Sequence, residues 1–264
     1  MLCIKASYNM AYIQLDSVKK IYYRLIEGNG NNPYLIFLHE GLGCSAMWKD
    51  FPDQLCHNTS CPGLVYDRLG YGKSSPLSRT RTIHYMHDYA LNELPKVIEY
   101  IIPTKPYILV GHSDGGSISL IFGAEKSLLL KAIITEAAHV FVEKETIKGI
   151  KNANKSYDKG NFNNLSKYHG EKTHSIFKAW SNTWLSQWFK HWNIEYLLPS
   201  IECPLLVVQG CQDQYGTDRQ VGSIVSKSAI NAASILLENC GHSPHREQAR
   251  RVLQIMSDFV KQQI

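Results

Sequence analysis

The stretch YILVGHSDGG, residues 107–116, contains a G-x-S-x-G pattern centred on Ser113. An apolar run suited to a buried strand precedes it, and a helix is expected to begin directly after it. A serine at so tight a turn has its hydroxyl exposed above the edge of a sheet, and the flanking glycines leave no Cβ atoms to collide with the turn. The pattern alone also fits an ordinary glycine-rich turn, but its place between strand and helix predicts that Ser113 is a nucleophile.

Short apolar runs recur along the chain, separated by Gly and Pro. Strands are expected at residues 11–15, 21–27, 34–39, 63–67, 107–110, 131–135, 205–209 and 234–238, and helices at 91–100, 117–122 and 248–260. The first two strands alternate as an antiparallel edge hairpin does, whereas the others are continuously apolar, which is typical of parallel strands covered on both faces. Helix 91–100 is expected to place Leu91, Leu94, Val97 and Ile98 on one face. The chain therefore predicts an α/β fold with a mostly parallel, eight-stranded sheet flanked by helices.

Residues 139–198 interrupt this alternation, because they contain no strand-like run and are too many for an ordinary connection. They are interpreted as an inserted helical cap between two parts of one core, residues 1–138 and 199–264. The first half of the insertion is polar and predicts mainly loop. In the second half Trp180, Trp184, Trp188 and Trp192 repeat every four residues, which predicts a single helical stripe.

The tryptophan stripe is expected to pack the cap onto the core, and Trp180, Trp184 and Trp188 are also candidates to cover the substrate. An apolar pocket with few charges would follow. Such a pocket favours a small, neutral and partly hydrophobic molecule as substrate.

A serine hydroxyl needs a neighbouring base to remove its proton. Loops after parallel strands lie along one edge of the sheet, and His242 follows the last expected strand in the motif GHS. His245 is the rival, but it begins the final helix and is expected to face solvent. His112 is expected to point away, because adjacent residues diverge at the turn. With His242 as base, activity should rise with pH through about 6–7.

The base in turn needs an acid that holds the imidazole in one tautomer. Asp213 lies just past the seventh strand and is the preferred candidate, while Glu136, past the sixth strand, is the main alternative. Acyl transfer also needs two N–H donors for the developing oxyanion. One is expected from Asp114, and the other from the loop after the third strand, with Gly41 as first choice and Leu42 as second.

Five motifs resemble, in the same order, those of the α/β-hydrolase superfamily and specifically its small capped members. They are HEGLG at 39–43, DRLGYGKS at 67–74, GHSDGG at 111–116, GCQD ending at Asp213, and GHS at 241–243. The resemblance covers nearly the whole chain and implies an α/β-hydrolase fold with Ser113, Asp213 and His242 as a catalytic triad. Glu40 is a departure, since many relatives have glycine after the histidine, and it leaves open which N–H completes the oxyanion hole.

The chemistry implied is hydrolysis of a carboxylic ester through an acyl-enzyme, with no cofactor. The turn between strand and helix that carries Ser113 is called the nucleophile elbow. Relatives that open epoxides or remove halide have aspartate at this position, so Ser113 argues against both reactions. Hydrolysis of a C–C bond, lactone, thioester or amide, and cofactor-free perhydrolysis, suit the same triad, and the fold does not choose among them. A ligand-binding receptor or partner-binding module on a hydrolase scaffold is the alternative from another class.

Composition limits the partners, the compartment and the metal binding that can be expected. The formal charge of +5 comes from scattered basic residues, so neither nucleic acid nor membrane is an expected partner. The seven cysteines, Cys3 among them, form no C-x-x-C pair, and residues 1–12 lack the pattern of a signal peptide, so a reducing, cytoplasmic setting is expected. No carboxylate or cysteine accompanies the histidine pairs 84/87 and 242/245, so no metal is expected. The protein is expected to be a monomer or a homodimer.

Overall fold

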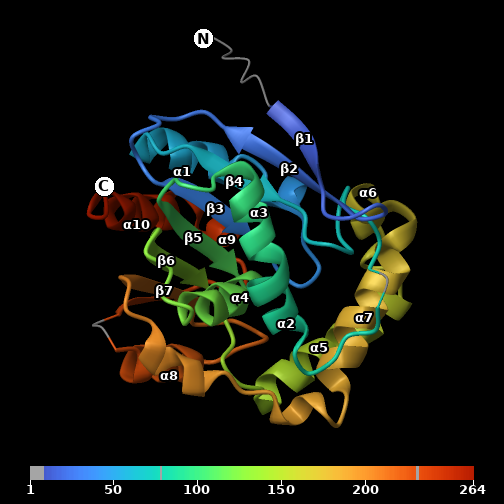
Figure 1. Ribbon diagram of the computed structural model, residues 1–264. Coiled ribbons are helices and arrows are strands. Elements are labelled where there is room, and N and C mark those ends of the chain that lie inside the picture. Colours follow the sequence, from blue (N-terminus) through green and yellow to red (C-terminus); the bar gives the residue numbers. More distant parts are fainter. Residues whose placement is uncertain (1–8, 78, 230–231) are drawn as a thin grey trace.

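An eight-stranded sheet forms the centre of the molecule in the computed structural model, which describes residues 9–77, 79–229 and 232–264. The strand order is β1-β2-β4-β3-β5-β6-β7-β8. β1 pairs antiparallel with β2, and β2 with β4, whereas all other neighbours are parallel (Figure 1). The predicted fold class is therefore confirmed. Residues 1–8, which include Cys3 and most of the segment examined for a signal peptide, lie outside the described residues.

The bounds of the elements are as follows. The strands are β1 Asn9–Gln14, β2 Lys20–Ile26, β3 Tyr34–Leu38, β4 Gly63–Tyr66, β5 Tyr107–His112, β6 Leu130–Glu136, β7 Leu205–Gly210 and β8 Ala233–Leu237. The α-helices are α1 Phe51–Thr59, α2 Tyr85–Asp88, α3 Leu94–Ile101, α4 Asp114–Gly123, α5 Lys144–Asp158, α6 Ser166–His169, α7 Thr173–Leu185, α8 Asp218–Lys227, α9 Pro244–Glu247 and α10 Ala249–Lys261.

The continuously apolar strands are buried on both faces, as their composition predicts. In β3, Leu35 and Phe37 belong to one core cluster together with residues of α1 and α10, while Ile36 and Leu38 belong to the other with residues of α3 and α4. Successive side chains of a strand point to opposite faces, so an apolar run supplies both cores at once. Because β3, β5, β6 and β7 pair in parallel, their carboxyl ends share one edge of the sheet.

Two details differ from the expectation. The helix predicted from residue 91 is already helical from Tyr85 and contains a π-helical turn at Tyr89–Glu93. The wider turn shifts the following residues relative to an α-helical period. Leu94, Val97 and Ile98 are buried, whereas Leu91 is 38% exposed, so the prediction that all four lie on one face was wrong for Leu91. β8 is an edge strand of which only Leu237 is buried, so its apolar run does not indicate cover on both faces.

Residues 139–198, here called the β6–β7 segment, contain α5, α6 and α7 and contribute no strand to the sheet in the described part of the chain. The prediction of mainly loop in its first half was wrong, because α5 is a 15-residue helix. Its buried face is formed by Thr146, Gly149, Ile150 and Ala153, whose small and polar members hide the helical period. A Cβ on Gly149 would lie 2.4 Å from the carbonyl oxygen of Gln214, so glycine lets the helix approach the loop after β7.

The predicted single tryptophan stripe was also wrong. α7 ends at Leu185, and Ser186 has an extended backbone. Trp180 and Trp184 therefore lie on the helix, whereas Trp188 lies beyond it and is 45% exposed. Trp192 is buried and packs against Trp184, with ring centroids 5.8 Å apart.

Candidate active site

The turn between β5 and α4 holds Ser113 in a strained conformation. Ser113 has φ 53° and ψ −117°, a region that costs a residue with a side chain roughly 1–3 kcal/mol. Neighbouring backbone enforces the turn: a Cβ on Gly111 would lie 2.3 Å from the carbonyl oxygen of Gly115, and a Cβ on Gly115 would lie 2.0 Å from that of Leu38. The two glycines of the motif are thus required by close approach, and the serine is placed at the N-terminus of α4.

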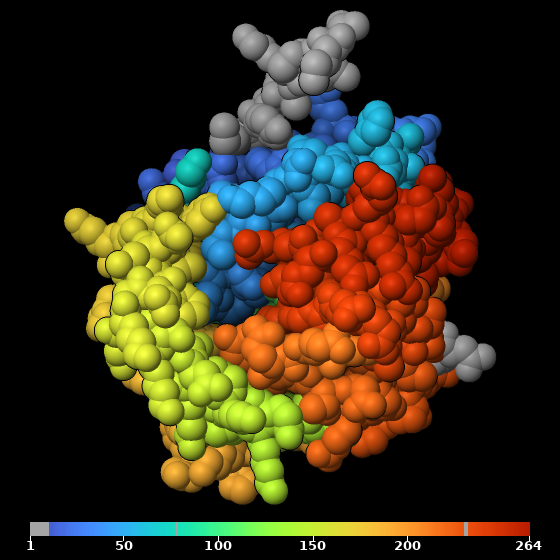
Figure 2. Space-filling model, turned by 180° about the vertical axis from the view of Figure 1, so that it is seen from behind, coloured from blue at the N-terminus to red at the C-terminus, as the bar shows by residue number. Residues whose placement is uncertain are grey.

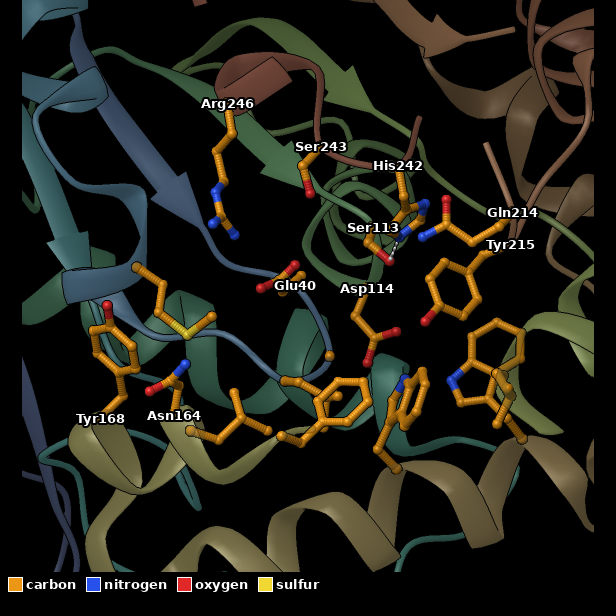
Figure 3. Close-up of a pocket in the computed structure, with 18 of the residues that line it drawn as sticks. Glu40, Ser113, Asp114, Asn164, Tyr168, Gln214, Tyr215, His242, Ser243 and Arg246 are labelled. Carbon is orange, nitrogen blue, oxygen red and sulfur yellow. Dashed lines mark hydrogen bonds between the residues drawn. The ribbon is translucent and has the colours of Figure 1, made fainter. Parts of the chain in front are cut away.

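Two side chains from other loops form a hydrogen-bonded line with this serine. His242 Nε2 lies 2.9 Å from Ser113 Oγ (Figure 3). His242 Nδ1 lies 2.8 and 2.9 Å from the two carboxylate oxygens of Asp213. The carboxylate can only accept, so Nδ1 carries a proton, and in the neutral ring Nε2 is left as the acceptor facing the hydroxyl. The structure brings together the three residues predicted from the sequence, in the hydrogen-bonded order Ser113, His242, Asp213.

The side chain of Asp213 is buried, and both of its carboxylate oxygens accept hydrogen bonds. Besides His242, it accepts hydrogen bonds from Gln209 Nε2 at 2.7 Å and from the backbone N–H of Tyr215 at 2.8 Å. Burial acts to raise the pKa of Asp213, but His242, the backbone N–H of Tyr215 and the nearby His139 outweigh it and lower that pKa to about 2. The alternative acid, Glu136, does not contact His242 and instead bonds to His245 Nδ1 at 2.6 Å.

The protonation of His242 reflects two opposing effects. Burial disfavours the imidazolium, but the charge and hydrogen bond of Asp213, aided by Glu40 and Asp114, outweigh burial and raise the pKa of His242 above 6.5. A raised pKa means that the ring stays protonated to a higher pH and is an active base only above it.

We expect kcat/KM to rise with pH through a midpoint above 6.5 and then to level off, because only the neutral imidazole can accept the proton of Ser113. The measurement is kcat/KM for a p-nitrophenyl ester across pH 5–9, corrected for spontaneous hydrolysis. A profile that is flat from pH 5 to 8, with the protein folded throughout, would exclude His242 as the base.

Backbone donors for an oxyanion lie beside the serine. Within the described ranges, no hydrogen bond occupies the N–H of Gly41, Leu42 or Asp114, and all three residues line the same cavity as Ser113. The buried guanidinium of Arg68 donates from Nη1 to the carbonyl of His39 and from Nη2 to that of Glu40 at 2.9 Å. Arg68 thereby holds these two carbonyls on the core side of the loop, and the N–H groups of Gly41 and Leu42 remain free to face the cavity.

Behind the triad lies a buried cluster that the sequence did not predict. His245 is 5% exposed, and donor atoms of His112, Glu136 and His245 lie within 4.8 Å of one another. The expectations that His245 faces solvent and that no carboxylate accompanies the 242/245 pair were both wrong, because α9 turns His245 inward against the ring of Trp48 at 4.5 Å. A metal ion here would have to displace the hydrogen bond between His245 and Glu136.

His112 supports the loop that carries His242. Its Nε2 lies 2.7 Å from the carbonyl oxygen of His242. A carbonyl only accepts, so Nε2 carries the proton, and burial, only partly offset by Glu40, lowers the pKa of His112 to about 4. The neutral ring therefore donates steadily to the loop that carries His242.

Above the triad is a cavity of about 510 Å³, a size typical of small-molecule sites. Figure 2 shows its mouth as a hollow between the yellow-green β6–β7 segment and the red C-terminal part. Trp180 and Trp184 line it, but Trp188 does not, so the expected contact of Trp188 with substrate was wrong because α7 ends before it. The cavity is also more charged than expected: Glu40, Lys49, Lys167 and Arg246 line it.

Several supporting side chains carry no recognisable sequence signal. Tyr85 donates its hydroxyl hydrogen to Asp114 Oδ2 at 2.8 Å and accepts from Trp184 Nε1 at 3.1 Å. The ring of Tyr215 lies 4.8 Å from that of His242, and His139 Nε2 lies 3.0 Å from the carbonyl oxygen of Tyr215. Each contact joins segments far apart in the chain, so no local motif could indicate it.

Comparison with known proteins identifies the class. A sequence profile of the alpha/beta hydrolase family matches residues 35–255, and the chain belongs to this family. A proline iminopeptidase of Saccharolobus solfataricus is 23% identical, covering 92% of this chain and 89% of that protein. A serine hydrolase from Cycloclasticus zankles superposes with a TM-score of 0.78 at 14% identity, covering 96% of this chain and 97% of that one. The esterase RhEst1 from Rhodococcus sp. ECU1013 has a TM-score of 0.72 at 17% identity, covering 98% and 100%.

The fold and family define a hydrolase. The similar proteins named above are an iminopeptidase, a serine hydrolase and an esterase. In the described ranges, no helix combines the length and apolar character needed to cross a bilayer.

Proposed function

We propose that the protein is a serine hydrolase that cleaves a small carboxylic ester through an acyl-enzyme. Ser113 is the nucleophile, His242 the general base and Asp213 the acid that orients it. The observation that carries this proposal is the continuous hydrogen-bonded line from Ser113 Oγ through both nitrogens of His242 to the carboxylate of Asp213. A nucleophile, its base and the orienting acid must lie within hydrogen-bond distance of one another, and this structure meets that first requirement.

The reaction follows from the positions of the atoms. His242 Nε2 takes the hydroxyl proton as Ser113 Oγ attacks the ester carbonyl, and the resulting oxyanion is bound by the N–H of Asp114 and by N–H groups of the 40–42 loop. The imidazolium, stabilised by Asp213, then protonates the leaving alkoxide as the C–O bond breaks. A water molecule activated by His242 attacks the acyl-enzyme in the same way, which releases the acid and restores the serine.

The cavity suits a substrate with an apolar portion. Leu42, Ile150, Phe162, Trp180 and Trp184 line it together with the reacting serine, and apolar walls of this kind bury the hydrocarbon part of a ligand. The β6–β7 segment acts as a cap in this proposal, since α5 and α7 supply most of that wall. The charged residues provide for polar groups at other points of the substrate.

The test uses matched substrates. A panel of p-nitrophenyl esters with acyl chains of increasing length is compared with p-nitroanilides of the same acyl groups. The proposal predicts turnover of the esters, with kcat/KM that rises with chain length until the cavity is filled and then falls. Turnover of the anilides at equal or greater kcat/KM would replace the ester assignment by an amide one.

Cleavage of an amide next to a free amine is the second candidate, and Glu40 favours it. Its carboxylate lines the cavity on the loop beside Ser113. One carboxylate oxygen lies 3.3 Å from Nδ1 of His112, and no lysine or arginine pairs with it within the described part of the chain. A carboxylate so placed can bind a substrate ammonium group. Several curated relatives are proline iminopeptidases.

If that candidate is correct, Glu40→Gln lowers the preference for a free amine by roughly tenfold to a hundredfold, the value of one charge-assisted hydrogen bond. The measurement is the ratio of kcat/KM for an aminoacyl p-nitroanilide to that for its N-acetylated form. Glu171→Gln, at an exposed site on the β6–β7 segment, is the matched control. An unchanged ratio in Glu40→Gln would remove the carboxylate from amine recognition.

A further inference from the structure

One buried histidine connects the β6–β7 segment to the loop that offers the oxyanion donors. His169, the last residue of α6, is 3% exposed. Its Nε2 lies 2.8 Å from the carbonyl oxygen of Leu42, and its Nδ1 accepts the backbone N–H of Gly72 at 3.0 Å. An N–H only donates and a carbonyl only accepts, so the ring is the neutral tautomer with its proton on Nε2.

The other side of His169 is a rigid support. Gly72 has φ +46°, and a Cβ there would lie 2.0 Å from Asp67 Oδ2, so the turn that contains it admits only glycine. Lys172 Nζ donates to the carbonyls of Gly72 at 2.7 Å and Ser74 at 2.5 Å. His169 therefore bridges this fixed turn and the carbonyl of Leu42.

The bond to Leu42 completes the set of restraints on the loop. Arg68 holds the carbonyls of His39 and Glu40 from the core side, and His169 holds that of Leu42 from the β6–β7 segment. The free N–H groups of Gly41 and Leu42 lie between these two anchors. The carbonyl of Glu40 belongs to the same peptide unit as the N–H of Gly41, so Arg68 fixes that donor directly. The carbonyl of Leu42 belongs to the peptide unit that follows Leu42, so His169 fixes the unit on the far side of the Leu42 N–H. The peptide unit that carries the Leu42 N–H therefore lies between two units that are both held in place.

We propose that His169 is a positioning residue: by fixing the carbonyl of Leu42, it keeps the N–H donors of the 40–42 loop aimed at the oxygen that becomes charged when Ser113 attacks. This role rests on the proposed function, since it assumes an oxyanion at that place. It makes the β6–β7 segment part of the machinery that stabilises the transition state, in addition to a wall of the cavity.

Two variants of His169 separate the two hydrogen bonds. The amide nitrogen of Gln can occupy the position of Nε2 and keep the bond to Leu42, whereas the shorter Asn can accept from Gly72 but not reach Leu42. We expect kcat of His169→Asn to fall roughly tenfold or more, part of the 10²–10³ that loss of a whole oxyanion donor costs, with KM changed less than about threefold. His169→Gln should stay within about threefold of the wild type. His174→Asn, at an exposed site on α7, is the control for the substitution itself.

The readouts distinguish positioning from structural support. A trifluoromethyl ketone forms an adduct that carries the oxyanion, and its inhibition constant should rise in His169→Asn in proportion to the loss of kcat/KM. Thermal unfolding should show how much of each variant is folded. If the Asn variant does not fold, His169→Ala serves as the variant without the donor. If His169→Gln and His169→Asn have the same kcat, whether high or low, the positioning role of His169 is overturned, while the proposed function is not affected. Absence of hydrolysis of every carbonyl substrate by the wild type would overturn the proposed function itself.

Discussion

Replacing Ser113 by alanine is expected to lower kcat for p-nitrophenyl acetate by about 10⁴- to 10⁶-fold, because the acyl-enzyme can no longer form. The loss should appear without unfolding, since the hydroxyl of Ser113 bonds only to His242 among the described residues. Alanine also tolerates the turn no worse than serine does, because both carry a Cβ. The measurement is kcat of purified protein, with circular dichroism to verify the fold.

Ser226→Ala provides the matched control, since Ser226 lies exposed on α8. Its kcat should equal that of the wild type. Turnover by Ser113→Ala within tenfold of the wild type, in a preparation free of contaminating esterase, would show that another group performs the attack.

Asp213→Asn is expected to lower kcat by about 10³- to 10⁴-fold, because the amide cannot stabilise the imidazolium and favours the wrong tautomer of His242. The rising limb of the pH profile should move to lower pH at the same time, since the carboxylate is what raises the pKa of His242. Glu136→Gln is the matched carboxylate-to-amide control and should cost less than about tenfold, because Glu136 bonds to His245 rather than to the base.

The two variants discriminate between the acids that the sequence left open. A large loss in Glu136→Gln together with a small one in Asp213→Asn would reverse the assignment. Equal, moderate losses would show that neither carboxylate orients the base.

Local chemistry made much of the fold predictable. The apolar runs of β3, β5 and β7 supply both faces of a covered sheet, so their composition alone indicates buried parallel strands. The elbow was recognisable because its glycines are demanded by backbone contacts within a few residues. Given the sheet, the positions of Asp213 and His242 after β7 and β8 follow from the rule that such loops share one edge.

The features that could not be predicted depend on contacts across long stretches of chain. The inward turn of His245 requires Glu136 and Trp48, which belong to β6 and to the segment before α1. The tryptophan repeat continued past the true end of α7, because spacing alone does not show where a helix stops. The sequence pattern did not predict α5, because its buried face contains glycine, alanine and threonine. These residues are small enough to approach the loop after β7 but add little to a hydrophobic period.

The most direct test of the central claim is covalent labelling with a fluorophosphonate, which reacts only with a serine whose hydroxyl is activated by a base. Intact-mass and peptide analysis should find one label per chain, on Ser113, with no label in Ser113→Ala and much slower labelling in His242→Gln. A folded wild-type protein that stays unlabelled, or that is labelled at another residue, would contradict the claim that Ser113 and His242 form an active nucleophile and base.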